Sequence, residues 1–128
     1  MPSNLQTVLA FIDLWAIPDL DRIIDALAPD CRYHNMPWEP LIGHTAIRDG
    51  LAAFIGTSDA IDWRVFHAAE SADGTVMTER LDRFRVGGKW IEIPVMGIFE
   101  LADGKITHWR DYFDAAIFQS QMDALTPA

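Results

Sequence analysis

The sequence predicts one α+β domain, in which a strongly curved, mixed or antiparallel sheet packs against N-terminal helices. Apolar residues recur at helical spacing early in the chain, and four segments rich in aromatic and β-branched residues follow one another later. This order is typical of the α+β class, and a bent sheet with helices on its concave face forms a cone that can hold a ligand. Half of the 128 residues are hydrophobic. We therefore assign residues 1–128 to a single domain.

Two helices are expected at the N-terminus. Residues 4–16 carry apolar side chains at helical spacing, and Asn4 is a candidate N-cap. The segment Ile17-Pro18-Asp19 separates this helix from a second one, because proline interrupts helical hydrogen bonding. The second helix is amphipathic and is expected to end at Ala28-Pro29-Asp30. Its apolar stripe is formed by Leu20, Ile23, Ile24 and Leu27.

A short strand and a third helix are expected next. Residues 31–36 form the strand, on which Tyr33 and Asn35 point to the same side because side chains alternate along a strand. Residues 37–43 contain two prolines and a glycine, which predicts a loop. A helix over residues 44–55 follows, with its apolar side chains on one stripe.

Four consecutive strands are expected to complete the sheet. Pro94 has no backbone N–H, so we expect it at a bulge or at an edge position. A short helix over residues 115–125 follows the last strand. The strands are expected at residues 60–70, 75–86, 89–101 and 105–114. The turn signals between them are Asp73-Gly74, Gly87-Gly88 and Asp103-Gly104.

Charged residues on two of these strands are expected to meet. Arg80 and Asp82 lie two residues apart and therefore project from one largely apolar face. Asp111 shares a face with Trp109 and Phe113 on the last strand. If both faces line one cavity, an arginine lies between two carboxylates, which compensates charge that would be costly to bury alone. The face of Arg80 also carries Val76, Thr78 and Phe84.

Such a cluster can divide the roles of acid and base. Two carboxylates in a dry site resist double ionisation, so one can stay ionised while the other keeps a proton. Tyr33 and Asn35 add hydrogen-bonding groups that could hold a water molecule together with Asp111. A held water, a proton acceptor and an opposed carboxylic acid are suited to opening a strained ring, such as an epoxide, in one step.

These residues resemble the motifs of a known family. The pairs Tyr33-x-Asn35 and Arg80-x-Asp82, followed by Trp109-Arg110-Asp111-Tyr112-Phe113-Asp114, are similar to those of the limonene-1,2-epoxide hydrolases. The resemblance covers residues 5–120 and implies the cone of the NTF2-like and SnoaL-like superfamily. It also implies that water adds to a small, mainly apolar, cyclic or terpenoid-like epoxide, and that a vicinal diol is released.

The same resemblance implies a role for each polar residue. Asp111 would be the general base, and Tyr33 and Asn35 would position the attacking water. Asp82 would be the general acid toward the epoxide oxygen, and Arg80 would bridge the two carboxylates. The family needs no metal or organic cofactor and commonly forms homodimers through the outer face of the sheet. The expected substrate-binding residues are Trp109, Phe84, Ile93, Val95 and Phe113.

Composition indicates which binding partners and which cellular location to expect. The net charge of −9 argues against nucleic acid and against anionic membranes, because both require a basic surface. No apolar run approaches the roughly 20 residues that span a bilayer, and the N-terminus lacks signal-peptide character, so we expect a cytoplasmic protein. The single Cys31 is expected to be a buried, inert thiol. The spacing of the four histidines does not suggest a zinc site.

Other interpretations of the same residues remain open. Arg80 and Asp82 alone could form an ordinary surface ion pair. A SnoaL-like cyclase or an enzyme similar to ketosteroid isomerase would use one aspartate for proton transfer, without a water held by Tyr33 and Asn35. A non-catalytic module of this superfamily would bind a ligand or form a dimer without releasing a diol.

Overall fold

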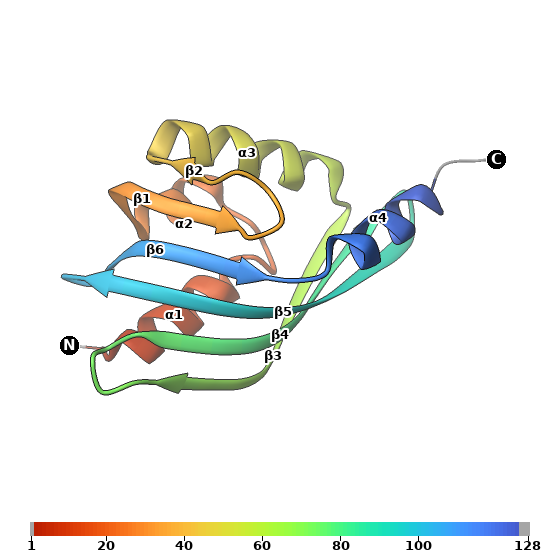
Figure 1. The fold of residues 1–128 in the computed structure, drawn as a ribbon. Coiled ribbons are helices and arrows are strands. Elements are labelled where there is room, and N and C mark those ends of the chain that lie inside the picture. Colours follow the sequence, from red (N-terminus) through yellow and green to blue (C-terminus); the bar gives the residue numbers. More distant parts are fainter. Residues whose placement is uncertain (1, 126–128) are drawn as a thin grey trace.

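The computed structural model describes residues 2–125 and confirms the α+β class, with helices packed against one curved sheet (Figure 1). The six strands lie in the order β2-β1-β6-β5-β4-β3. Helix α1 packs against β3 and β4, whereas α2 and α3 pack against β1. The elements are α1 (Asn4–Asp13), α2 (Leu20–Asp25), β1 (Leu27–Asn35), β2 (Leu41–Ile42), α3 (His44–Thr57), β3 (Ala60–Glu70), β4 (Val76–Val86), β5 (Lys89–Ala102), β6 (Lys105–Tyr112) and α4 (Ala115–Asp123).

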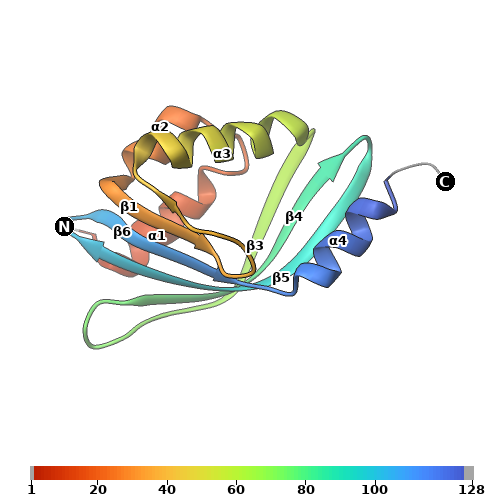
Figure 2. The same ribbon diagram turned by 45° about the horizontal axis from the view of Figure 1, so that its top comes forward.

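The sheet is mixed. Strands β3 to β6 form the expected antiparallel meander, and β1 then adds to β6 in a parallel arrangement. The ladder shifts between Val65 and His67 on β3 and between Glu100 and Leu101 on β5. Such irregularities bend a strand and increase its twist. Figure 2 shows β3, β4 and β5 bending sharply past the other strands, which gives the sheet its concave face.

The start of α1 differs from the prediction. Ser3, not Asn4, is the N-cap, because the Ser3 hydroxyl accepts a hydrogen bond from the Gln6 backbone while the Gln6 side chain accepts one from the Ser3 backbone. The Asn4 side chain instead donates to the Gly74 carbonyl oxygen at 2.9 Å. Asp19, in the segment that separates the two helices, is the N-cap of α2, and its carboxylate accepts a hydrogen bond from the Arg22 backbone.

The boundary between α2 and β1 was also predicted wrongly. Helix α2 ends at Asp25, and residues 28–30, which the sequence suggested would end this helix, belong to β1. Leu27 already pairs with Ile106 of β6, so tertiary pairing extends the strand toward the N-terminus. Pro29 is tolerated because it lies where the β1–β6 ladder is interrupted, between Leu27 and Arg32. Pro94 lies at an edge position as expected, because β6 pairs with β5 only from Met96 onward.

An aromatic cluster fills the space between α1 and the sheet. The ring of Phe11 packs edge-on against Trp109 at 5.1 Å and against Trp15 and Phe99 at 6.3 Å. All four side chains are buried. Trp15 of this cluster also lines the cavity next to it. No helix within residues 2–125 is both long and apolar enough to cross a bilayer.

We expect Phe11→Ala to lower the free energy of unfolding by about 3–5 kcal/mol, because the truncation leaves a cavity among three aromatic rings. The measurement is urea denaturation followed by circular dichroism. Ile17→Ala is the matched control, since Ile17 is 88% exposed, and it should change the unfolding free energy by less than about 0.5 kcal/mol. An unchanged urea midpoint for Phe11→Ala would contradict a role for α1 in the core.

Candidate active site

The structure brings Arg80, Asp82 and Asp111 together. Arg80 donates through Nε to Asp82 Oδ1 at 3.0 Å and through Nη2 to Asp82 Oδ2 at 2.9 Å. The same Nη2 donates to Asp111 Oδ2, also at 2.9 Å. The guanidinium is fully enclosed, and both carboxylates are nearly so. The interpretation of Arg80 and Asp82 as a surface ion pair is therefore wrong. One buried cation bridges two buried carboxylates, as the alternation of strand side chains predicted.

Aromatic rings and a hydroxyl complete the surroundings of the guanidinium. The Arg80 Cζ atom lies 5.4 Å from the centre of the Trp63 ring and 6.0 Å from that of Phe99, distances at which ring faces stabilise a cation. Arg80 Nη1 donates to Thr78 Oγ1 at 3.0 Å. Each nitrogen of the guanidinium thus has an acceptor, which offsets much of the cost of removing it from water.

Burial and charge act differently on the ionisable groups. Burial raises the pKa of Asp82, and nearby Asp111 adds to the rise, while Arg80 opposes it without cancelling it. Burial alone would lower the pKa of Arg80, but Asp111 and Asp82 more than offset this and raise it. Burial, followed by the charge of Asp111, raises the pKa of Tyr33. The cluster therefore combines a permanent cation, a carboxyl with increased proton affinity and a neutral phenol.

Tyr33 and Asn35 lie beside this cluster on β1. Asn35 pairs with Asp111 in the parallel ladder, and Tyr33 pairs with Trp109, whose ring stacks on the tyrosine at 3.9 Å. The Asn35 amide donates to the Tyr33 hydroxyl at 2.9 Å, and the hydroxyl lies 3.2 Å from Asn35 Oδ1. Asp111 Oδ1 has no hydrogen-bond partner within residues 2–125. The hydroxyl and the amide therefore fix each other, while Asp111 keeps an acceptor oxygen that no protein group uses.

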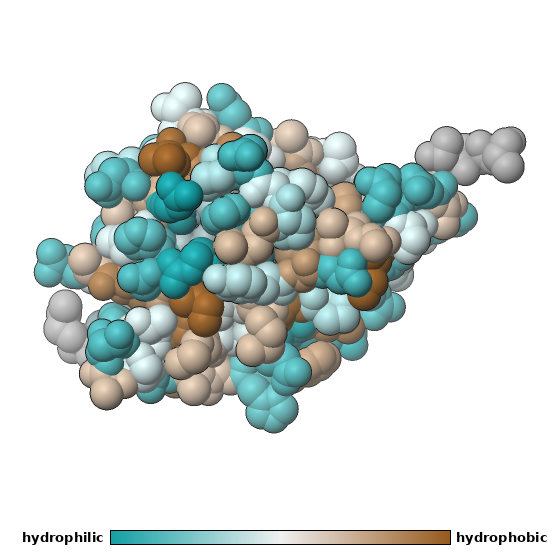
Figure 3. Space-filling model, in the orientation of Figure 1, coloured by the Kyte–Doolittle hydropathy of each residue, from teal (hydrophilic) through white to brown (hydrophobic). Residues whose placement is uncertain are grey.

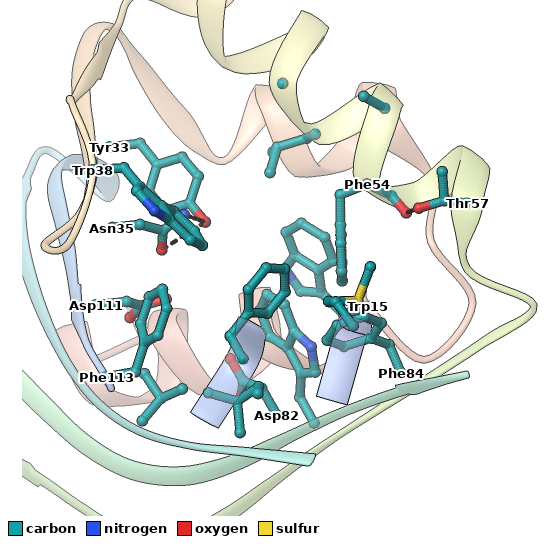
Figure 4. A pocket seen from close by; sticks show the side chains of 18 of the residues that line it. Trp15, Tyr33, Asn35, Trp38, Phe54, Thr57, Asp82, Phe84, Asp111 and Phe113 are labelled. Atoms are coloured by element: carbon teal, nitrogen blue, oxygen red, sulfur yellow. Dashed lines mark hydrogen bonds between the residues drawn. The ribbon is translucent and has the colours of Figure 1, made fainter. Parts of the chain in front are cut away.

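A cavity of about 430 Å³ opens above these groups. Asp82, Asp111, Tyr33 and Asn35 all contribute to its wall, and the remaining lining is almost entirely apolar. Figure 4 shows Asn35 and Asp111 on the same side of the cavity, with Asp82 at its base. A ligand bound here would meet most of the polar groups at one end, because Thr57 is the main polar lining residue elsewhere. That arrangement is typical of sites in which a few polar groups orient an otherwise apolar ligand.

The predicted pocket residues divide into two groups. Four of them line the cavity as expected, namely Phe84, Ile93, Val95 and Phe113. Trp109 does not reach the cavity wall, which corrects the expectation for this residue. It is fully buried behind Tyr33 and also stacks on Phe99 at 6.0 Å. It supports the site from behind, since its large ring fixes the position of the Tyr33 ring.

Much of the cavity wall comes from helices and was not predicted. Trp15, in the turn after α1, and Phe54 of α3 line part of the cavity, and Phe118 and Met122 of α4 line another part. Trp38, in the loop after β1, packs edge-on against Phe118 at 5.4 Å. These residues carry helical or loop patterns that predict burial but do not distinguish a core from a pocket. Only the three-dimensional arrangement shows that α4 covers one edge of the cavity.

The remaining reactive side chains lie outside the cluster. Within residues 2–125, no three or more His, Cys, Asp or Glu side chains are arranged to hold a metal ion. Cys31 is buried, and burial, with a smaller effect of Asp30, raises the pKa of its thiol to about 12. His34 Nε2 lies 2.8 Å from the Trp38 carbonyl oxygen, and His44 Nε2 lies 2.8 Å from that of Leu27. These contacts fix local backbone geometry.

Comparison with known proteins identifies relatives of this chain. Residues 2–123 match the family described as the limonene-1,2-epoxide hydrolase catalytic domain. Epoxide hydrolase EphG of Mycobacterium tuberculosis is 34% identical over 108 residues, which cover 84% of this chain and 70% of that protein. The structure of an LEH-like epoxide hydrolase from M. tuberculosis is similar with a TM-score of 0.82 and 28% identity, covering 95% of this chain and 91% of the other.

More distant structures share the fold alone. A candidate SnoaL-like polyketide cyclase from Shewanella denitrificans has a TM-score of 0.85 at 16% identity, with 97% of this chain and 99% of the other covered. TerC, co-crystallised with polyporic acid, has a TM-score of 0.81 at 19% identity, with 94% and 98% covered. These matches confirm the expected cone of the NTF2-like and SnoaL-like superfamily.

We expect Arg80→Met to lower the free energy of unfolding at pH 7 by about 3–5 kcal/mol, because it leaves two buried carboxyls without their cation. The loss should shrink as the pH falls toward 4. Without the guanidinium, the pKa of Asp82 rises further, and a carboxyl whose pKa is raised by folding ceases to destabilise the folded state near its unfolded pKa of about 3.9. Urea denaturation at several pH values measures both effects.

Arg48→Met is the control for this substitution. Arg48 pairs with Asp21 at 2.9 Å, but both side chains are largely exposed, so stability should change little at either pH. A loss of stability for Arg80→Met that is the same at pH 4 and pH 7 would contradict a buried charge cluster.

Proposed function

Because the chain belongs to the limonene-1,2-epoxide hydrolase family, we propose that it adds water to a small, mainly apolar epoxide by one-step general acid–base catalysis at Asp82, Arg80 and Asp111. The product is a vicinal diol. The observation that carries this proposal is the single guanidinium nitrogen that donates to both Asp82 and Asp111, each at 2.9 Å, at the base of an apolar cavity. Two carboxyls so linked can hold one proton between them.

The proposed reaction divides the work between the two carboxyls. Asp111 accepts a proton from water as the water oxygen attacks one carbon of the oxirane. The bond from that carbon to the epoxide oxygen breaks, and Asp82 donates its proton to the released oxygen. Asp82 is then ionised and Asp111 protonated, so a proton must return through water before the next turnover. The raised pKa of Asp82 supports its role as the acid, because the carboxyl must hold a proton before the reaction begins.

Tyr33 and Asn35 are proposed to hold the attacking water against Asp111. The Asn35 amide still has an N–H that is not needed for its bond to Tyr33, and it lies beside Asp111 in the strand ladder. Hydrogen bonds from two sides fix the water and aim one of its lone pairs at the substrate. Trp109 keeps the tyrosine ring in place by stacking on it.

The cavity limits the size and polarity of the substrate. Its volume of about 430 Å³ corresponds to roughly 14 water molecules at about 30 Å³ each, so a substrate of about ten to fifteen non-hydrogen atoms fits. The aromatic and aliphatic walls favour a cyclic or terpenoid-like hydrocarbon skeleton. Few polar atoms face the substrate on the helical side of the cavity, where Thr57 is one of the few polar lining residues.

We also propose that two copies of the chain pair through the outer face of the sheet. Met96, Tyr112 and Glu79 lie in one row across β5, β6 and β4, and Met96 and Tyr112 are among the exposed large hydrophobic residues. In the view of Figure 3, hydrophobic patches lie over β5 and β6 among hydrophilic side chains. Exposed hydrophobic side chains such as Met96 and Tyr112 on an open sheet face are a suitable contact surface for a second copy.

We expect Asp111→Asn to reduce diol formation from cyclohexene oxide or limonene oxide by at least about 10³-fold, because the amide cannot accept the proton of the attacking water. Asp82→Asn should have a similar effect, since an amide is a poor proton donor. Product formation is measured by chiral gas chromatography, and circular dichroism checks the fold. Asp62→Asn, which alters ion pairs with Arg64 and Arg83 outside the cavity lining, should retain turnover.

A single turnover in oxygen-18 water tests the one-step mechanism. The diol formed on that first turnover should contain one solvent oxygen. Unlabelled diol on the first turnover would indicate a covalent intermediate with an enzyme carboxylate and would contradict the mechanism. Wild-type rates for Asp111→Asn would contradict the base assignment.

We expect Met96→Asp to convert a dimer into a monomer, because it introduces a charge at the centre of the proposed contact. Size-exclusion chromatography with light scattering gives the mass of each form. Ile17→Asp is the control, since it introduces the same charge at another exposed hydrophobic residue, outside the sheet, and it should leave the mass unchanged. A monomeric wild-type protein would overturn the proposed contact.

A further inference from the structure

One row of residues crosses the inner face of the sheet at the cluster. Thr78 on β4 pairs with Gly97 on β5, Gly97 pairs with Asp111 on β6, and Asp111 pairs with Asn35 on β1. Gly97 is the only member of this row without a side chain. Arg80 starts two residues further along β4, and its guanidinium reaches diagonally into the space between Thr78 and Asp111.

Gly97 leaves the space that the guanidinium occupies. A Cβ atom at this position would overlap Arg80 Nη1, and it would lie only 2.8 Å from Thr78 Oγ1 and 2.9 Å from Asp111 Oδ1. The backbone of Gly97 is not in the left-handed region, so its conformation does not require glycine. Glycine in the interior of a strand is otherwise unfavourable. The physical reason for glycine here is therefore the close approach of the cluster.

Thr78 holds the side of the guanidinium that faces no carboxylate. Arg80 Nε and Nη2 are directed at Asp82 and Asp111, and only Nη1 bonds the Thr78 hydroxyl, at 3.0 Å. Thr78 is 1% exposed, so no solvent replaces its hydroxyl if that hydroxyl is removed. An unsatisfied N–H would then remain in a dry site, and the guanidinium would turn to find another acceptor.

We propose that Thr78 and Gly97 are positioning residues for the reaction: the hydroxyl and the missing side chain together fix the guanidinium in the orientation that bonds Asp82 twice and Asp111 once. This inference rests on the proposed function, because it assigns the two residues a task in dividing acid and base between those carboxyls. Neither residue touches the substrate in this proposal. Both act through Arg80.

The orientation of the guanidinium matters because it sets the charge that each carboxyl experiences. The charged and titratable groups that face Asp82 are Arg80, Asp111 and the Tyr33 phenol. Arg80 is the one among them that lowers the pKa of Asp82. If the guanidinium turns away, this lowering weakens and the pKa of Asp82 rises. Since the acid must be protonated, the alkaline limb of the pH–rate profile should move to higher pH.

The test compares Thr78→Val, which removes the hydroxyl but keeps the shape, with Thr78→Ser, which keeps the hydroxyl. We expect Thr78→Val to lower kcat by about tenfold or more, since misplaced catalytic groups lose rate steeply. KM should change by less than about twofold, because the side chain does not contact the substrate. The alkaline limb of the pH profile of kcat/KM should move to higher pH. Thr78→Ser should recover most of the lost turnover and the original limb.

Two further variants separate positioning from general effects on the fold. Gly97→Ala should lower both Tm and kcat, because its methyl group displaces the guanidinium. Thr107→Val removes a hydroxyl that donates to the Glu100 carbonyl oxygen at 3.1 Å in the same sheet, away from the cluster, and it should leave kcat and the pH profile unchanged. If Gly97→Ala does not fold, the two Thr78 variants decide the outcome.

Carboxyl carbon-13 NMR titration of Asp82 distinguishes this inference from the proposed function. If the wild type opens no epoxide but Thr78→Val raises the pKa of Asp82, the positioning is correct and the proposed function fails. If the wild type is active and Thr78→Val retains its kcat, its pH profile and the titration of Asp82, the positioning is overturned. The positioning is also overturned if Thr78→Ser and Thr78→Val lose kcat equally and neither moves the alkaline limb of the pH profile.

Discussion

A single buried guanidinium is the constraint on which the site depends. An apolar cavity can hold two carboxylates only if their charge is balanced at close range, and Arg80 provides that balance through three hydrogen bonds to these two carboxylates, while a fourth goes to Thr78. The rings of Trp63 and Phe99 face the cation, and Gly97 leaves room for it. These residues therefore offset the free-energy cost of burying the positive charge of Arg80.

The sheet brings Arg80, Asp82 and Asp111 together because side chains alternate along its strands and because the strands bend. Period-two alternation sends Arg80 and Asp82 from β4 to the inner face, while pairing across β5 brings Asp111 within reach of the guanidinium. The parallel addition of β1 beside β6 then places Asn35 next to Asp111. Helices and strands together supply the mostly apolar remainder of the wall, so the carboxyls and their neighbours Tyr33 and Asn35 gather in one part of the cavity. A bound substrate consequently has one end at which chemistry can occur.

Local pattern was sufficient to predict the strands of the meander, their turns and the shared face of Arg80 and Asp82. It failed where distant pairing decides the outcome. The segment around Pro29 has a helix-ending composition but joins β1, because Leu27 pairs with Ile106 across the sheet. Trp109 follows the same alternation as Asp111, yet the Tyr33 ring lies between it and the cavity. The helical residues of the cavity wall have core-like spacing, and periodicity cannot distinguish a core from a pocket.

The protonation state of Asp82 and the orientation of the Arg80 guanidinium are coupled. A guanidinium that donates to both oxygens of Asp82 favours the ionised carboxylate, whereas burial favours the protonated acid, and burial prevails. A proton on one Asp82 oxygen weakens the bond from Arg80 to that oxygen, which leaves the guanidinium free to strengthen its bond to Asp111. Both carboxyls are thus linked through one guanidinium nitrogen, Nη2. Residues that limit how far the guanidinium turns therefore influence how strongly each carboxyl is bound to Arg80, and in the proposed reaction this decides which one serves as the acid.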